Sequence, residues 1–213
     1  MTKAIELKTR KAEMAKILMK IDALKFGVFK LTSGKNSPYY IDLRVVPSFP
    51  DAFTQICDFY AQSITNQIGL KNFDRIAGVP IAGIPFASQI AYNLKKPFLY
   101  VRKGIRRHGR QRRVEGILVS GDRVLLVDDL VTTGLTLRKA AEAIRAEGGI
   151  VDKAVAFLDR EEGGKEKLAK HGLQLHALLK ISEVAKILYE TAAIDEESYK
   201  TIMKQVKKEK KMN

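Results

Sequence analysis

One stretch decides the fold of this chain, Val124-Leu125-Leu126-Val127-Asp128-Asp129-Leu130-Val131-Thr132-Thr133-Gly134-Leu135-Thr136. Its first four residues are apolar and predict a buried β-strand, and the two aspartates lie where that strand is expected to end, facing the solvent. A short loop rich in threonine and glycine follows and opens onto a helix expected from Leu137 to Ala146. A strand, a loop and a helix in this order are typical of α/β proteins.

This stretch contains the groups that hold a phosphorylated sugar. The backbone N–H groups and the dipole at the start of a helix attract phosphate, and the hydroxyls of Thr132, Thr133 and Thr136 are further donors. The carboxylates of Asp128 and Asp129 can accept hydrogen bonds from ribose or approach a Mg²⁺ ion held by the ligand's other phosphates. An acidic pair alone is common at the edge of ordinary sheets, but the complete order of segments favours a functional site.

The remaining sequence predicts alternating strands and helices around this stretch. Several strands after Asp74 are continuous apolar runs, which is typical of a parallel sheet covered by helices on both faces. The expected elements are strands 75–79, 97–101, 123–127, 151–158 and 173–179, and helices 84–94, 137–147 and 164–171. Ligands of such sheets bind beyond the carboxyl ends of the strands, where Asp128, Asp129 and Asp159 all lie.

The two ends of the sequence predict a smaller unit beside this sheet. The expected elements are an amphipathic helix over 3–24, strands over 28–31 and 39–43, a helix over 51–68, and helices over 181–190 and 195–209. We therefore expect a single α/β domain of 213 residues with its core at about 50–180. A small hood is expected to combine residues of about 1–45 with the C-terminal segment.

Composition restricts the class of protein. The chain is 46% hydrophobic and 29% charged, which is typical of a soluble globular protein, and no apolar run has the length that crosses a membrane. The N-terminal sequence lacks the apolar segment of a signal peptide. The only cysteine, Cys57, excludes an intramolecular disulfide and lies among apolar residues, so we expect a buried thiol. These features predict a cytoplasmic protein.

The positive charge is concentrated in two segments. The formal net charge is +14, and residues 102–116 contain seven Lys or Arg residues against one Glu. A second cluster lies at Lys204–Lys211. A basic chain raises the possibility of a nucleic-acid ligand, but no zinc-finger spacing or RNA-binding aromatic motif accompanies the charge. A basic loop that closes over a polyanionic small molecule accounts for much of the excess.

Five segments resemble the type I phosphoribosyltransferases, and Val124–Thr136 matches their fingerprint of an apolar strand, an acidic pair and a Thr-rich phosphate loop. Residues Phe29–Arg44 resemble the signature Phe-x-Leu-x-Ser-Gly-x-x-Ser-Pro-Tyr-Tyr-x-Asp of the orotate phosphoribosyltransferases. In that family the segment belongs to a hood over the base, whereas a plain β-hairpin is the simpler interpretation. Thr32 stands where some relatives have lysine.

Residues Gly78–Pro85 resemble the pyrophosphate-binding loop of the same family, whose backbone amides hold the diphosphate. Similar enzymes often have a non-proline cis peptide bond here, which would join Pro80 to Ile81. Some relatives have lysine at the position of Ala82, so more of the charge neutralisation is left to Mg²⁺ and to the basic loop.

Residues Arg102–Gly109 resemble the family's flap, Arg-Lys-x-x-Lys-x-His-Gly, with Arg106 in place of the second lysine. Arginine keeps the charge but does not deprotonate, so this residue can stabilise the leaving group but cannot be its general acid. His108 is then the candidate for donating a proton or hydrogen bond.

Residues Phe157–Gly164 resemble the family's strand-end Asp-Arg-x-Glu motif. Arg160 would pair with the carboxylate of orotate, a planar acceptor that suits a guanidinium group. Purines have no such carboxylate, so this residue discriminates between base specificities. The other interpretation is a surface cluster of ion pairs.

The resemblance implies transfer of a phosphoribosyl group from 5-phosphoribosyl 1-diphosphate to orotate, with Mg²⁺ held mainly by the substrate near Asp128 and Asp129. The implied catalytic residues are Asp128, Asp129, Lys103, Arg106 and His108. The implied contacts to 5-phosphoribosyl 1-diphosphate are Ile81, Ala82, Arg102, Lys103, Arg106, His108, Asp128, Asp129, Leu130, Val131, Thr132, Thr133, Gly134, Leu135 and Thr136. The implied contacts to orotate are Thr32, Tyr40, Ile41, Thr132 and Arg160.

Related enzymes are homodimers in which the flap reaches the neighbouring subunit's site, so the resemblance also implies a homodimer with shared sites. Two alternatives remain at this stage. A phosphoribosyltransferase for another base would keep residues 128–136 but use the hood differently. A non-catalytic regulator on the same fold would use its basic surface to bind nucleic acid.

Overall fold

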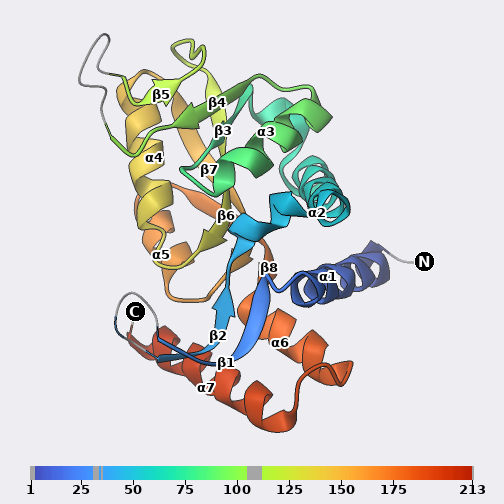
Figure 1. Ribbon diagram of the computed structural model, residues 1–213. Helices are drawn as coiled ribbons and strands as arrows, with labels where there is room; N and C mark the ends of the chain where they lie inside the picture. The colour runs from blue at the N-terminus through green and yellow to red at the C-terminus, as the bar shows by residue number, and fades with distance from the viewer. Residues whose placement is uncertain (1–2, 31–33, 35, 105–111, 213) are drawn as a thin grey trace.

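The computed structural model describes residues 3–30, 34, 36–104 and 112–212 (Figure 1). The α-helices are α1 (Lys3–Lys20), α2 (Pro50–Ser63), α3 (Gly83–Leu94), α4 (Leu135–Ala146), α5 (Gly164–Ala169), α6 (Ile181–Glu190) and α7 (Glu196–Met212). The strands are β1 (Leu24–Lys30), β2 (Asn36–Ile41), β3 (Arg75–Gly78), β4 (Phe98–Val101), β5 (Val114–Glu115), β6 (Arg123–Val131), β7 (Ile150–Asp159) and β8 (Gln174–Lys180). Short helical turns are η1 (Leu43–Ser48), η2 (Ile64–Ile68) and η3 (Leu70–Asn72).

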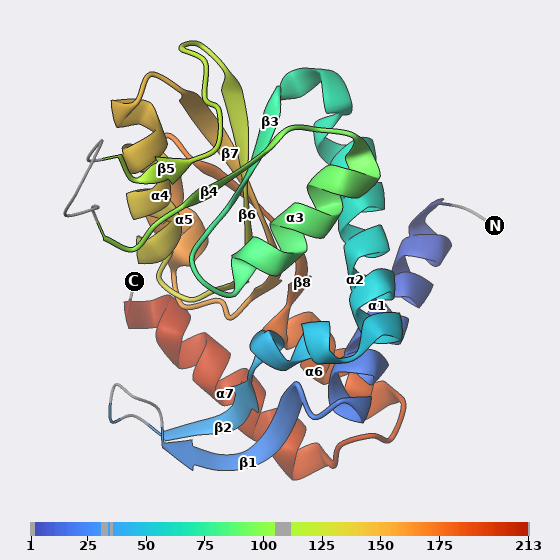
Figure 2. The same ribbon diagram turned by 45° about the horizontal axis from the view of Figure 1, so that its top comes forward.

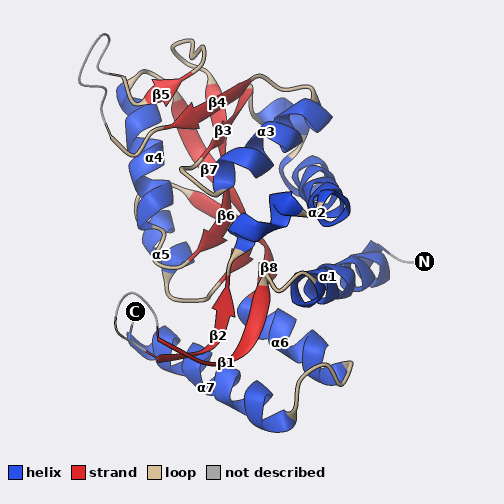
Figure 3. Cartoon of the chain, viewed as in Figure 1, coloured by secondary structure: helices blue, strands red, loops and turns tan. Residues whose placement is uncertain are grey.

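A six-stranded sheet forms the centre of the molecule, in the order β5-β4-β3-β6-β7-β8 (Figure 3). All neighbouring strands pair in parallel except β4 and β5, which are antiparallel. The expected class, a mostly parallel α/β sheet flanked by helices, is confirmed. The edge strand β5 was not predicted, because two residues are too few to show a periodicity.

Strand β6 shows why this sequence forms a sheet that is covered on both faces. Leu125 and Val127 belong to the core cluster that includes residues of α2 and α3, whereas Val124 and Leu126 belong to the cluster with α4. Successive side chains point to opposite faces of a strand, so a continuous apolar run fills both cores. Each such side chain contributes about 1.5–3 kcal/mol when fully buried.

The expected end of this central strand was wrong. We expected a strand over 123–127, but β6 continues to Val131 and pairs with β7 as far as Asp159. The backbone groups of both aspartates are therefore part of the sheet, because parallel pairing depends on the main chain and tolerates a polar side chain at the strand's end.

The hood side is built from segments distant in sequence. β1 and β2 form a separate antiparallel pair, and α1 and α7 both contact this hairpin (Figure 2). The expected helix over 3–24 is too long, since α1 ends at Lys20 and Asp22 has a positive φ of 58°. The proposed boundaries between hood and core stay a prediction.

Two further expectations concern burial and membranes. The thiol of Cys57 is free and fully buried, as predicted, and burial raises its pKa to about 12. In the described ranges, no helix combines the length and apolar character needed to cross a membrane.

Candidate functional site

Asp128 and Asp129 lie near the C-terminal end of β6, the central strand that pairs with β3 on one side and β7 on the other. Asp128 is only 6% exposed and Asp129 is half-buried, so the expectation that both face the solvent was wrong for Asp128. The backbone N–H of Asp129 donates to Oδ1 of Asp128 at 3.0 Å. The hydroxyl of Tyr60, from α2, donates to the backbone carbonyl of Asp128 at 2.6 Å. Within the part of the chain that the structure describes, the pair is thus held by main chain and core rather than by counter-ions.

The surroundings of both carboxyl groups disfavour their charged forms. Burial raises the pKa of Asp128 well above its ordinary value, and the neighbouring charge of Asp129 raises it further. Burial also raises the pKa of Asp129, with a smaller contribution from Asp42. Such a pair favours a ligand that brings positive charge or hydroxyl donors, and strongly shifted carboxyls of this kind are typical of functional sites.

The loop between β3 and α3 packs directly on this pair. The N–H of Val79 donates to the carbonyl of Val127 at 3.0 Å. A methyl group on Gly83 would lie 2.8 Å from the carbonyl oxygen of Val127 and 2.9 Å from Cα of Asp128, so only glycine allows this approach. The peptide bond between Pro80 and Ile81 is cis, as expected, and Ile81 is exposed.

The loop after β6 has the form expected of an anion site. Gly134, with φ of 77°, is the residue before the first turn of α4, and Thr133 and Thr136 are exposed beside it. A methyl group on Gly164 would lie 2.5 Å from the carbonyl of Thr132. The start of α5 therefore supports the loop of residues 132–136 from behind, a role for Gly164 that the sequence motif did not reveal.

The remaining expected contacts to the phosphorylated sugar surround this loop. Leu130 and Thr132 are half-buried, Val131 is buried and Leu135 is exposed. Ala82 is half-buried at the start of α3. The structure thus brings residues 128–136 together with residues 79–83, which lie about fifty positions earlier in the chain.

Arg160 follows β7 on the hood side of the same sheet edge. Its backbone N–H donates to the carbonyl of Val131 at 2.9 Å, and the residue is 8% exposed. The guanidinium carbon lies 5.0 Å from the ring centre of Tyr39, and Nε lies 2.8 Å from Oε1 of Glu162 in an ion pair without good hydrogen-bond geometry. Within the described residues, Nη2 is buried and has no hydrogen-bond partner, so it can receive an anionic ligand.

Tyr39 is a candidate site residue that we did not predict from the sequence motif. We expected Tyr40 and Ile41 at the base, but Tyr39 is the ring that contacts Arg160. Tyr39 and Ile41 are buried on one face of β2, whereas Tyr40 is 37% exposed on the other. Strand alternation could have separated these residues had the inner face been known. Thr32 lies outside the described residues.

The flap is described only at its two ends. The side chain of Arg102 pairs with Glu115 at 3.1 Å across β4 and β5, and Lys103 is exposed. Arg106 and His108 lie outside the described residues. The two described ends of this segment therefore lie at β4 and the edge strand β5.

The donors present fit a metal ion only if a ligand supplies most of its coordination. Among the residues that are described, no group of three or more His, Cys, Asp or Glu side chains could hold a metal. Mg²⁺ commonly binds through one or two carboxylates together with water and substrate phosphates. Asp128 and Asp129 are suited to that arrangement.

Comparison with known proteins agrees with this geometry. Residues 50–186 match the family model described as a phosphoribosyl transferase domain. The chain is 45% identical to the orotate phosphoribosyltransferase of Staphylothermus marinus over 87% of this chain and 89% of that protein. It is 42% identical to the one from Sulfolobus acidocaldarius, over 89% and 94%. The crystal structure of the Aeropyrum pernix enzyme of the same name aligns with a TM-score of 0.74, 34% identity, and coverage of 85% and 99%.

Proposed function

This chain belongs to the phosphoribosyl transferase family, and we propose that it transfers the 5-phosphoribosyl group of 5-phosphoribosyl 1-diphosphate to orotate. The products are orotidine 5′-monophosphate and diphosphate, as part of pyrimidine biosynthesis. The observation that supports this most is the buried Nη2 of Arg160, which is unpaired among the described residues and follows β7, the strand that pairs with β6 alongside Asp128. It gives one site an anion receptor for a base and acceptors for a sugar.

The chemistry requires a site that separates charge. Displacement of diphosphate from the anomeric carbon places positive charge on the ribose and negative charge on the leaving group. Asp128 and Asp129 accept hydrogen bonds from the ribose hydroxyls and stabilise the developing cation. The loop of residues 132–136 holds the 5′-phosphate at the N-terminus of α4.

Backbone N–H groups and positively charged side chains hold the diphosphate leaving group. The backbone amides near Ile81 and Ala82 face the diphosphate, and the cations Arg102, Lys103 and Arg106 neutralise it. His108 donates a proton or hydrogen bond to it. Bound Mg²⁺, near Asp128 and Asp129, supplies further charge neutralisation for the diphosphate.

The base side sets specificity. Arg160 binds the orotate carboxylate through a charge-assisted pair, while Tyr40, Ile41, Thr32 and Thr132 surround the ring. A purine would leave Nη2 of the guanidinium without a partner, which is unfavourable for a buried donor. The same geometry supports orotate over other bases.

We further propose that the protein acts in the cytoplasm as a homodimer in which each flap completes the partner's site. β4, at whose end the flap begins, carries the exposed Tyr100, and Tyr92 on neighbouring α3 is 69% exposed. Exposed aromatic side chains of this kind are enriched at protein interfaces.

Loss of orotate absorbance during incubation with 5-phosphoribosyl 1-diphosphate and Mg²⁺ tests the reaction. Parallel assays contain uracil, adenine, guanine or hypoxanthine. Among these bases, we expect turnover only with orotate. Turnover of a purine instead would assign a different base, and salt-dependent RNA or DNA binding without any turnover would favour the non-catalytic alternative.

A further inference from the structure

The last helix of the structure reaches the loop that contains Arg160. α7 contacts α6 and β2, and two views place its final turns beside α5 (Figures 1 and 2). Ile202 and Val206 are buried on its inner side, at 0% and 3% exposure. Lys210 follows at the same spacing of four residues, so its side chain leaves the helix on that side. The helix thereby brings a cation to the segment after β7.

That cation pairs with Glu161, the neighbour of Arg160. Nζ of Lys210 lies 2.8 Å from Oε1 of Glu161, whose side chain is 6% exposed. The backbone N–H of Ser182, in the first turn of α6, donates to Oε2 at 3.0 Å. Burial alone would raise the pKa of Glu161, but the bonds from Lys210 and Ser182 hold it below its ordinary value. The carboxylate is therefore charged and bound at both oxygens.

The backbone at this residue is held in an unfavourable conformation. Glu161 has a φ of 59°, which is uncommon for a residue with a side chain. Its N–H donates to Oδ1 of Asp159 at 2.8 Å. Conformations of this kind persist where surrounding contacts determine them, and here those contacts are the bonds to Asp159, Ser182 and Lys210.

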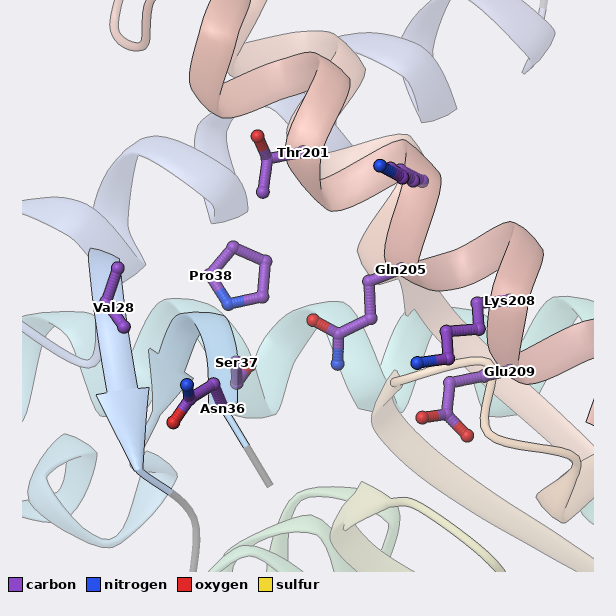
Figure 4. Close-up of a pocket in the computed structure, with 9 residues that line it drawn as sticks. Val28, Asn36, Ser37, Pro38, Thr201, Gln205, Lys208 and Glu209 are labelled. Carbon is purple, nitrogen blue, oxygen red and sulfur yellow. The ribbon is translucent and has the colours of Figure 1, made fainter. Parts of the chain in front are cut away.

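Packing between α7 and the hairpin leaves room at this end of the helix. A pocket of about 610 Å³ lies between part of α7 and the hairpin, with Val28 and Pro38 on the hairpin facing Thr201, Gln205 and Lys208 on α7 (Figure 4). The pair of Lys210 with Glu161 lies at a second pocket of about 250 Å³, which Asp159 also lines. The ion pair therefore connects the helix and the loop across an open region.

We propose that Lys210 is a positioning residue for the base, an inference that rests on the proposed function. Through Glu161 it fixes the main chain beside Arg160 and thereby directs the guanidinium towards the orotate carboxylate. Lys210 itself does not contact the substrate. The C-terminal helix is thus a component of base recognition, although it belongs to neither the sugar nor the phosphate site.

Steady-state kinetics of Lys210→Met test this role. The wild-type protein is assayed first, because absence of orotate turnover there would overturn the proposed function together with this inference. With an active wild type, the KM for orotate should rise about fivefold in Lys210→Met, the scale of one partly exposed ion pair. The KM for 5-phosphoribosyl 1-diphosphate should stay within about twofold, and Lys210→Arg should restore the wild-type value.

Two further variants separate positioning from stability. Lys200→Met is the matched control, because Lys200 is on the same helix and pairs with Glu196 at 2.8 Å far from Arg160. Its orotate KM should not change. The double variant Glu161→Gln, Lys210→Met removes both charges of the pair, so no unpaired charge stays buried. It should show the raised orotate KM with a melting temperature close to that of the wild type. An unchanged orotate KM in the double variant, or an equal rise in both KM values, would overturn the inference.

Discussion

The two halves of the proposed site are constructed differently. The sugar-phosphate half consists of two loops at the ends of β3 and β6 that contact through the main chain, where Gly83 and Gly164 allow approaches too close for any side chain. The base half joins the hairpin, the segment after β7 and α7 through side chains, with Tyr39, Glu162 and Lys210 as the contacts.

Because of this difference, the two halves should tolerate different kinds of substitution. Main-chain contacts are independent of most side chains but allow no additional atoms, so the sugar-phosphate half should be rigid and intolerant of added volume. Side-chain ion pairs can be exchanged one at a time for modest losses. Changes in the first half should therefore affect turnover, and changes in the second should affect one substrate's affinity.

The largest effect is expected for Asp128→Asn combined with Asp129→Asn. The asparagines keep an acceptor oxygen for the local hydrogen bonds but remove the charge that stabilises the ribose cation, so turnover should fall by a factor on the order of 10²–10³. Stopped assays measure turnover, and circular dichroism checks the fold. Near-normal turnover by the folded variant would remove the acidic pair from the mechanism.

Mixing two inactive variants tests whether the sugar-phosphate half is shared between chains. One carries Asp128→Asn and Asp129→Asn, and the other carries Lys103→Ala and His108→Ala. A mixed dimer would have one site with both lesions and one intact site, so random re-association should return up to about a quarter of wild-type activity. Each variant taken through the same exchange alone is the control. If verified exchange restores nothing, the flap serves its own chain.

Arg160→Ala should affect the base half alone. Loss of a charge-assisted bond to the orotate carboxylate costs about 1.5–3 kcal/mol, which corresponds to a rise in orotate KM of roughly 10- to 100-fold. The KM for 5-phosphoribosyl 1-diphosphate should change little. Arg123→Ala, which removes an exposed arginine paired with Asp74, is the matched control. An unchanged orotate KM in Arg160→Ala would assign this residue to a structural ion pair.

Gly83→Ala tests the rigidity of the main-chain contacts. The added methyl would meet the β6 backbone at 2.8–2.9 Å, and overpacking of this kind costs about 1–3 kcal/mol in the free energy of unfolding. Urea denaturation measures the loss. Gly104→Ala is the control for stability, since its methyl would meet no atom of the described residues within 4 Å. Equal stabilities of the two variants would show that the loop moves freely.

The smallest effect concerns the stability of the unliganded protein against pH. The folded state raises the pKa of both Asp128 and Asp129, so it binds protons more readily than the unfolded chain, in which aspartate has a pKa of about 3.9. The wild type therefore loses stability as pH rises through the folded-state values. The double asparagine variant should melt a few degrees higher at pH 8, with the difference shrinking towards pH 4 in scanning fluorimetry. A pH-independent difference would contradict this.

The sugar-phosphate half was easier to predict from the sequence than the base half. Apart from β5, the elements from β3 to β8 were identified together with the acidic pair, because strand, carboxylates, loop and helix are contiguous at 124–146. The strand's end and the burial of Asp128 were missed, since both depend on pairing with β7. Nothing in the local pattern indicates that Tyr39 and Lys210 lie against the segment after Asp159. Such long-range side-chain contacts follow from tertiary packing alone.

The hairpin of β1 and β2 has a consequence for the order in which the protein forms. A two-stranded sheet is only marginally stable by itself, and one of the two helices that contact this one, α7, follows every other described element. Chains fold progressively as they leave the ribosome. The hairpin is synthesised among the first segments, yet its packing is complete only after the last described helix emerges. A nascent chain would therefore complete its sugar-phosphate half well before it could distinguish one base from another.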